Sequence, residues 1–402
     1  MRIIFCIALI TWSYITSANP LTKERWIAEP FANALGGGPS TGPIEQSGAD
    51  TNSICQNKQG NIFIIDGQII DIVTPDGIRR HLAGIGELGF QDGAARFARF
   101  KLGVRAFYGA RSLACGLHND VFIADSGNQR IRRLFKNGST WTVSTWAGGG
   151  KQRLETNQTT KPDAIKLGGT LAVAVRTNGE LVIGGPHGYY IVDAEGKHIT
   201  LAGKWPLSTS NKADQPAQLN IMRGDNDDLG NTYFVANTPN VVIQITPDNK
   251  AIHLAGLVNP GNNKRKIGDG MPRKVWFGAS SSIAANPDGS ALYLTGGDEY
   301  DIRLIPTNMN SSTHTLMQNG QWYKASVHPN ASRGPAVIKP AANGKLKPDG
   351  ELTNLMVSYL YGRDYQGNLF CGLNQWSGMS QLIEGEGLLG TRVFRLRRTQ
   401  SD

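Results

Sequence analysis

Short runs of β-branched, aromatic and other apolar residues recur along this chain, separated by turns rich in glycine, asparagine and aspartate. A Gly-Asn-like turn marks each recurrence, and the six turns begin at residues 60, 119, 179, 230, 289 and 367. Intervals of 59, 60, 51, 59 and 78 residues lie between them. A sheet-sized unit repeated at this spacing is typical of an array or a ring of small sheets.

Each recurrence contains four predicted strands. In the first, they cover residues 53–56, 62–65 and 69–73 and a fourth run that ends in Ala83-Gly84. The same Ala-Gly ending recurs at residues 147–148, 202–203 and 255–256. The runs are continuously apolar, as expected where both faces of each sheet are covered by neighbouring sheets. The pattern therefore predicts an all-β protein, a six-bladed β-propeller with four-stranded blades.

The last unit lacks one of its strands. It runs through residues 392–396 and stops without the Ala-Gly strand, whereas residues 26–38 near the N-terminus resemble residues 144–150 of the second unit. A strand from the N-terminus that completes the last blade would remove an exposed sheet edge. We therefore expect the ring to be closed by this N-terminal strand.

The second unit carries a family resemblance. Residues 121–125 with Asn128, Arg130 and Arg132, preceded by residues 89–93 and 95–97, resemble the NHL-repeat family. This resemblance implies a β-propeller, often of six blades, in a family whose members include binding scaffolds and a few lyases or hydrolases. Because Asp125, Asn128 and the two arginines belong to the repeat itself, we expect them to stabilise the turn rather than to bind a ligand.

The N-terminus predicts export. Met1-Arg2 is followed by an apolar run from residue 3 to residue 12 and by small residues that end at Ala18, which is typical of a cleaved secretory signal peptide. We therefore expect residues 1–18 to be removed and residues 19–402 to form one propeller that is secreted or periplasmic. No stretch predicts a transmembrane segment. The long last interval indicates an insertion around residues 306–353.

Charge and cysteine content narrow the possible partners. The chain has 41 basic and 32 acidic residues, a formal net charge of +9. For an exported protein, this balance favours an anionic polysaccharide or surface over nucleic acid, although a solvated basic surface without a specific partner gives the same balance. Beyond the signal lie Cys55, Cys115 and Cys371. We expect them to be small buried apolar residues, with one bridge between Cys55 and Cys115 geometrically feasible.

The candidate ligand-binding residues enter the innermost strands or replace the usual loop residues, since propeller sites gather where the inter-blade loops emerge. Arginine next to tyrosine suits anionic or sugar ligands, because a guanidinium binds carboxylates in two places and an aromatic ring stacks on a pyranose. The candidates are Arg105, Tyr108, Arg111, His187, Tyr189, Arg223, Asp225, Tyr361, Arg363 and Asp364.

No metal or cofactor is predicted. The histidines fall on strands that do not converge, so three of them cannot share one ion. A calcium site built on Asp225, Asp227, Asp228 or Asp364 stays open. We predict no nucleophile elbow, phosphate-binding loop or dinucleotide-binding unit.

Two functions follow from these residues. The first is an exported, monomeric binding scaffold without catalytic activity, for an anionic glycan or a partner protein. The alternative is a lyase or hydrolase that acts on a carbohydrate or small ester, using arginine and tyrosine with His187 or an aspartate. The binding hypothesis leads because no nucleophile, base and orienting group occur together in the pattern.

Overall fold

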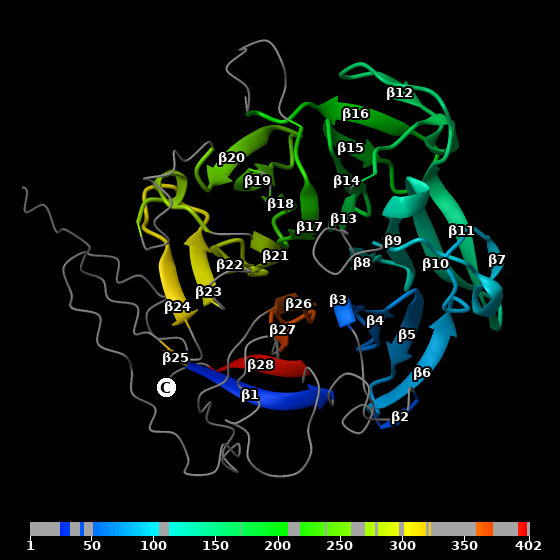
Figure 1. Cartoon of the computed structure of the whole chain (residues 1–402), viewed down its shortest axis with the longest axis horizontal. Helices are drawn as coiled ribbons and strands as arrows, with labels where there is room; N and C mark the ends of the chain where they lie inside the picture. The colour runs from blue at the N-terminus through cyan, green and yellow to red at the C-terminus, as the bar shows by residue number, and fades with distance from the viewer. Residues whose placement is uncertain are drawn as a thin grey trace, which may run out of the picture.

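A computed structural model of the chain describes residues 25–32, 41–43, 51–103, 112–169, 171–207, 218–237, 239–258, 270–277, 280–296, 301–318, 321–322, 359–372 and 393–399. Six antiparallel sheets stand in a ring, each with one edge toward the central axis (Figure 1). The all-β, six-bladed propeller expected from the sequence is confirmed.

The blades follow one another along the chain, and the strands of each blade succeed one another from the axis outward. Blade one holds β3 (Thr51–Gln56), β4 (Ile62–Asp66), β5 (Ile69–Val73) and β6 (Ile78–Ala83). Blade two holds β8 (Leu113–Cys115), β9 (Val121–Asp125), β10 (Arg130–Asn137) and β11 (Thr140–Gly148). Blade three holds β13 (Ala172–Val175), β14 (Leu181–Gly185), β15 (Gly188–Val192) and β16 (Ile199–Gly203).

The second half of the ring repeats the arrangement. Blade four holds β17 (Ile221–Asn226), β18 (Thr232–Asn237), β19 (Asn240–Ile245) and β20 (Ala251–Ala255). Blade five holds β21 (Ser280–Ala285), β22 (Ala291–Gly296), β23 (Asp301–Pro306) and β24 (His314–Gln318). Blade six holds β26 (Tyr359–Arg363), β27 (Leu369–Gly372), β28 (Val393–Thr399) and β1 (Arg25–Ala32).

Four blades carry a fifth, two-residue strand at the outer edge that the sequence pattern did not predict. These strands are β2 (Gly42–Pro43), β7 (Gly93–Ala94), β12 (Thr159–Thr160) and β25 (Gln321–Trp322). Each pairs with the outermost strand of its blade and covers part of an edge that would otherwise expose backbone donors and acceptors.

The ring closes through the two ends of the chain, as expected. β1 pairs antiparallel with β28 in a register that runs from Arg25 opposite Thr399 to Ala32 opposite Val393. In Figure 1, the blue N-terminal strand lies along the red C-terminal strand at the outer side of blade six. The last blade therefore combines strands from opposite ends of the sequence.

The core lies between neighbouring blades, which explains why the strands are apolar without alternation. All five residues of β9 are buried, and one cluster joins Phe63 of blade one to Val121 and Leu134 of blade two. A second cluster joins Tyr233 of blade four to Leu292 of blade five. Both faces of a blade are therefore removed from water, the condition that the continuous apolar runs indicated.

The conspicuous polar group of the second unit stabilises the fold. Asp125 and Arg132 are both fully buried, and their side chains form an ion pair of 2.8 Å. Asn128 Nδ2 donates to the same carboxylate oxygen of Asp125 at 2.8 Å, while Arg132 also donates to the carbonyl oxygen of Gln91. These contacts fix the loop before blade two to the blade itself, in agreement with the expected structural role.

The described residues include only part of the segments for which we predicted a signal peptide and an insertion. Residues 1–18, the predicted signal peptide, lie outside the described residues, and within the described part no helix is long and apolar enough to cross a membrane. β24 and β25 fall within residues that we assigned to the insertion, so that segment includes the outer strands of blade five. Residues 323–353 lie outside the described residues.

Candidate functional site

The turns between the first and second strand of each blade, which we call the inner turns, surround one end of the central axis. Their first residue is usually asparagine or aspartate, as in Asn57 and Asp364. Asp364 Oδ1 accepts hydrogen bonds from the backbone N–H groups of Gln366 and Asn368, both at 2.9 Å. Asn57 Oδ1 does the same for its own turn. A left-handed glycine follows in each case, with φ of 82° at residue 60 and 87° at residue 367.

A cavity of about 190 Å³ opens among these inner turns. Its walls are the ends of β3, β8, β13, β17 and β26 where these strands leave the axis, together with the inner turns that follow them. The sequence pattern places the site at the opposite end, where the chain enters the innermost strands. Among the described residues, the loops that border the cavity are instead the inner turns.

Five of the ten candidate residues meet at the cavity. They are Arg223, Asp225, Tyr361, Arg363 and Asp364. Arg105, Tyr108 and Arg111 lie outside the described residues. His187, in the turn after β14, and Tyr189, in β15, do not border the cavity. Both lie near the Ala172 end of β13, whereas the cavity is at the Val175 end of that strand.

Tyr189 is a core residue. It is 3 % exposed, its hydroxyl donates to the carbonyl oxygen of Asn249 at 2.9 Å, and its ring lies 5.5 Å from that of Trp205. Burial raises the pKa of its hydroxyl. His187 is exposed on the neighbouring turn. Neither residue therefore contributes a catalytic group to the cavity.

Asp225 and Arg363 form an ion pair in the cavity wall. Arg363 Nε lies 3.0 Å from Asp225 Oδ2, and its Nη2 donates to the carbonyl oxygen of Asn226 at 2.7 Å. Asp225 Oδ2 also accepts the backbone N–H of Ala285 at 2.8 Å. The pair thereby joins blades four, five and six, and both charged groups are occupied by protein partners.

Arg223 gives the cavity a buried positive charge. Its side chain is 7 % exposed, and Nη1 donates to the carbonyl oxygen of Leu360 at 2.8 Å. Burial lowers the pKa of its guanidinium to about 10, and the nearby Tyr361 and Asp225 oppose that shift. Arg223 is therefore charged at neutral pH, at a place where few water molecules screen it.

Tyr361 and Asp364 are held by the fold. Tyr361 is 5 % exposed and packs with Ile54 and Phe370 between blades six and one. Asp364, 1 % exposed, accepts the two backbone bonds of its inner turn and also contacts Asn368 and Arg395 through Oδ2. Both residues border the cavity with mostly buried side chains, and their protein contacts fix the shape of its wall.

Of the four carboxylates proposed for calcium, Asp225, Asp227 and Asp364 have protein partners, whereas Asp228 is exposed. Asp227 accepts from the backbone and side chain of Asn231 and from the Tyr233 hydroxyl, at 2.8 Å in each case. Across the described residues, no group of three or more histidine, cysteine, aspartate or glutamate side chains converges on one point. The oxygens of Asp225, Asp227 and Asp364 thus stabilise turns and blade contacts.

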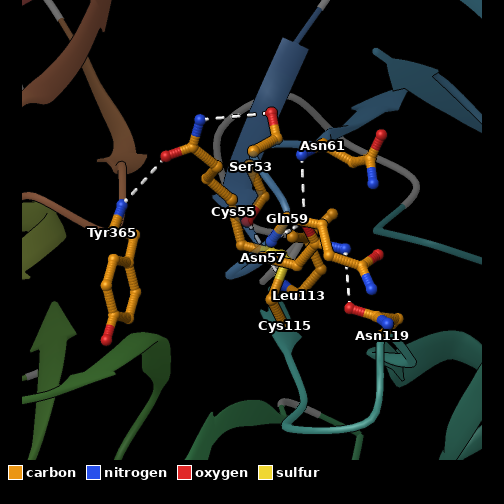
Figure 2. The surroundings of a disulfide bond; sticks show 11 residues. Ser53, Cys55, Asn57, Gln59, Asn61, Leu113, Cys115, Asn119 and Tyr365 are labelled. Atoms are coloured by element: carbon orange, nitrogen blue, oxygen red, sulfur yellow. Dashed lines mark hydrogen bonds between the residues drawn. A yellow bond between two sulfur atoms is a disulfide. The ribbon is translucent and has the colours of Figure 1, made fainter. Parts of the chain in front are cut away.

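Sequence reasoning did not identify the second residue of the inner turns as a ligand-binding position, although it named Asp228 as a possible calcium ligand. Lys58, Leu117, Thr177, Asp228 and Tyr365 hold this place in five blades, and all five border the cavity. Tyr365 is 51 % exposed, and the Lys58 ammonium lies 5.9 Å from the centre of its ring. The backbone N–H of Tyr365 donates to Gln56 Oε1 at 3.1 Å, which is the dashed line at Tyr365 in Figure 2. Aligning the inner turns of the six units would have shown that the residue at this position differs from blade to blade.

A disulfide joins Cys55 of β3 to Cys115 of β8 in the cavity wall (Figure 2). Their Cα atoms are 5.7 Å apart and the two residues are 60 positions apart in the sequence. We expected both to be small buried apolar residues and left a bridge between them open as feasible. The bridge is present, because the repeat brings equivalent positions of adjacent innermost strands side by side. Cys371 is free and buried, as expected, and burial raises the pKa of its thiol.

Comparison with known proteins supports the fold. No family model and no curated protein matches the chain. An auxiliary nutrient binding protein from Bacteroides thetaiotaomicron is 11 % identical with a TM-score of 0.57, and the similarity covers 94 % of this chain and 77 % of that protein. One from Bacteroides ovatus is 12 % identical with a TM-score of 0.51, covering 94 % and 78 %.

A streptogramin B lyase also matches this chain. It is 14 % identical with a TM-score of 0.46, and the match covers 93 % of this chain and 98 % of the lyase. At such low identities, the similarity shows the fold alone. The chemistry of the site must therefore be argued from the residues of this chain.

Proposed function

We propose that this chain is an exported, monomeric binding protein that takes an acidic sugar unit of a glycan into the inner-turn cavity. The observation that carries this proposal is the half-exposed Tyr365 ring beside Lys58 at the cavity rim, with charged Arg223 in the wall. An aromatic face suits a pyranose ring, and the two cations suit a carboxylate.

The size of the cavity limits what enters it. Sites for drug-sized ligands commonly enclose about 300–1,000 Å³, whereas this cavity encloses about 190 Å³. It therefore has room for one sugar ring, and the remainder of an oligosaccharide would lie on the rim formed by the second residues of the inner turns. The similarity to two auxiliary nutrient binding proteins is compatible with a binding role.

The residues of the cavity favour binding over the lyase or hydrolase alternative. No histidine is present among the described residues that line it, and Asp225 is paired with Arg363. General acid–base chemistry needs a group that can exchange a proton within hydrogen-bond reach of the substrate. Of the other two aspartates in the described lining, Asp364 pairs with Arg395 and Asp228 is exposed. Beside them, the lining offers arginine and lysine side chains and an aromatic face, which are elements of recognition.

Export is the second part of the proposal. Residues 1–18 have the pattern of a signal peptide, and the Cys55–Cys115 disulfide is of a kind that persists in oxidising compartments. Without residues 1–18, which include Arg2, the formal net charge of +9 becomes +8, and this balance favours anionic polysaccharides as neighbours. For a basic protein in this setting, uronic-acid polymers and other anionic glycans are more accessible ligands than nucleic acid.

Isothermal titration with oligogalacturonates and with neutral gluco-oligosaccharides of equal length tests the proposal. We expect the acidic ligand to bind more tightly, and binding to persist at about 0.3 M salt, since screening removes non-specific attraction first. Tyr365→Ala should weaken binding about tenfold, equivalent to about 1.4 kcal/mol. Leu229→Ala is the matched control, because Leu229 is 64 % exposed on an inner turn without bordering the cavity.

Other outcomes would redirect the interpretation. Equal affinity for the acidic and the neutral oligosaccharides would exclude the role given to Arg223 and Lys58. Unsaturated or shortened products in the titration cell would show that the protein is a lyase or hydrolase. An unchanged affinity of the Tyr365→Ala variant would move the binding site away from the inner turns.

A further inference from the structure

A second surface, on the loop before blade two, exposes a concentration of apolar side chains. Nine large hydrophobic side chains are exposed among the described residues, and four of them fall between residues 85 and 97. These four, which we call the apolar patch, are Ile85 at 39 %, Leu88 at 49 %, Phe90 at 46 % and Phe97 at 65 % exposure. Clustered exposed apolar side chains commonly mark an interaction surface.

The loop that carries the apolar patch is folded and firmly attached. Its two arms are joined by backbone hydrogen bonds from Gly84 to Ala95, from Ile85 to Ala98 and from Gly89 to Phe100, between 2.9 and 3.1 Å. A short 3-10 turn (Ala95–Phe97) buries Ala95 and turns the Phe97 ring into solvent. The exposure of the patch is therefore built into an ordered backbone.

Basic residues surround the apolar patch. Arg96 and Lys101 are exposed, and the Arg130 guanidinium lies 4.1 Å from the centre of the Phe90 ring. The neighbouring acidic groups have partners: Glu87 pairs with Arg99 at 3.2 Å, and Asp92 pairs with the buried Arg132. The surface around the patch consequently carries a surplus of positive charge.

The part of the loop around Gly89 and Lys101 lies at the end of the propeller opposite the cavity. Asn128 Nδ2 donates to the carbonyl oxygen of Gly89 at 2.7 Å, and the backbone N–H of Gly127 donates to the carbonyl oxygen of Lys101 at 3.0 Å. Residues 126–128 connect β9 to β10, at the other end of β9 from the inner turn of blade two. A partner on the patch would leave the cavity mouth open.

We infer that the apolar patch is a docking site for an anionic lipid membrane. Phe97 and Leu88 would enter the boundary between headgroups and acyl chains, while Arg96, Lys101 and Arg130 face lipid phosphates. A stable protein interface needs about 800 Å² from each partner, more than four side chains on one loop supply. A membrane requires only a few inserted apolar groups and a basic surface, and the net charge, +8 once Arg2 has left with residues 1–18, adds long-range attraction.

Vesicle co-sedimentation tests this inference, with protein recovered after export so that the leader residues are absent. Phosphatidylcholine vesicles containing about one quarter phosphatidylglycerol should bind the protein, and pure phosphatidylcholine vesicles should bind it much more weakly. Raising the salt from about 0.05 M to about 0.5 M should lower the partition at least about fivefold.

Matched variants separate the patch from the rest of the surface. Phe97→Ser and Leu88→Ser should each reduce the partition about tenfold, because each removes an apolar side chain that enters the membrane. Arg96→Glu should reduce it comparably by repelling the lipid phosphates. Leu229→Ser, at 64 % exposure on the cavity face, should leave it unchanged. Each substituted side chain is exposed, so unchanged circular dichroism and melting temperature confirm that the fold is retained.

Several results would overturn the inference. These are no binding of the original protein to the anionic vesicles, equal binding to both vesicle types, or equal losses for Leu229→Ser and Phe97→Ser. A mass by light scattering that falls to the monomer only in Phe97→Ser would instead assign the patch to contacts between copies of the chain. Glycan binding can be measured in the same samples, so the failure of one proposal is distinguishable from the failure of the other.

Discussion

At the scale of single residues, the carboxylates nearest the cavity mostly serve the backbone. Asp364 has the pattern of a ligand-binding residue in the sequence, yet it is 1 % exposed. It accepts hydrogen bonds from the backbone N–H groups of Gln366 and Asn368 and from the side chains of Asn368 and Arg395. The exposed second position of the same turn, Tyr365, is the residue free to meet a ligand. Function is therefore expected where the repeat varies.

This assignment predicts the effect of removing the Asp364 carboxylate. Asp364→Ala should lower the free energy of unfolding by about 3 kcal/mol, because buried donors and a charged partner lose their acceptor. Asp228→Ala, one position into the inner turn of blade four and exposed, should change it by less than about 0.5 kcal/mol. Urea denaturation of both variants measures the difference, and equal losses would contradict the structural role of Asp364.

At the scale of elements, the disulfide is the one covalent link that the described residues add between blades. β8 is only three residues long, and its last residue, Cys115, is bridged to β3. Innermost strands of adjacent blades belong to separate hydrogen-bonded sheets. The bridge consequently fixes the cavity wall at a place where, without it, only side-chain packing would hold the two strands together.

Reducing this bridge should destabilise the protein measurably. Closing a loop of 60 residues corresponds to about 4 kcal/mol of unfolded-state entropy. Urea midpoints with and without reductant should differ accordingly for the original protein. The double variant Cys55→Ser, Cys115→Ser should have the lower midpoint in both conditions and no response to reductant. A reductant response in the double variant would point to a different thiol.

The elements also show what sequence reasoning could and could not reach. The continuous apolar runs predicted the blades, because a strand such as β9, without a polar face, must be covered on both sides. The pairing of Cys55 and Cys115 stayed open, since a spacing of one repeat does not fix which way the side chains point. The end of the axis that holds the cavity could not be read from the pattern, because apolar periodicity is the same at both ends of a strand.

At the scale of the whole molecule, the ring depends on one seam. Every other blade forms from consecutive strands, but blade six needs β1 from the start of the chain. Folding of this blade therefore waits until segments more than 360 residues apart, Ala32 and Val393, have met. The same seam protects β28 from becoming an edge strand.

Deleting β1 is the test of this seam. A chain that begins at residue 33 loses a ladder of seven residue pairs, and at about 1 kcal/mol for each net hydrogen bond its free energy of unfolding should fall by several kcal/mol. The exposed β28 edge should also pair between molecules, giving a mass that rises with concentration in light scattering. A chain that begins at residue 25 retains β1 and is the matched control. If the two truncated chains had equal stability and equal mass, the N-terminal strand would not be what closes the ring.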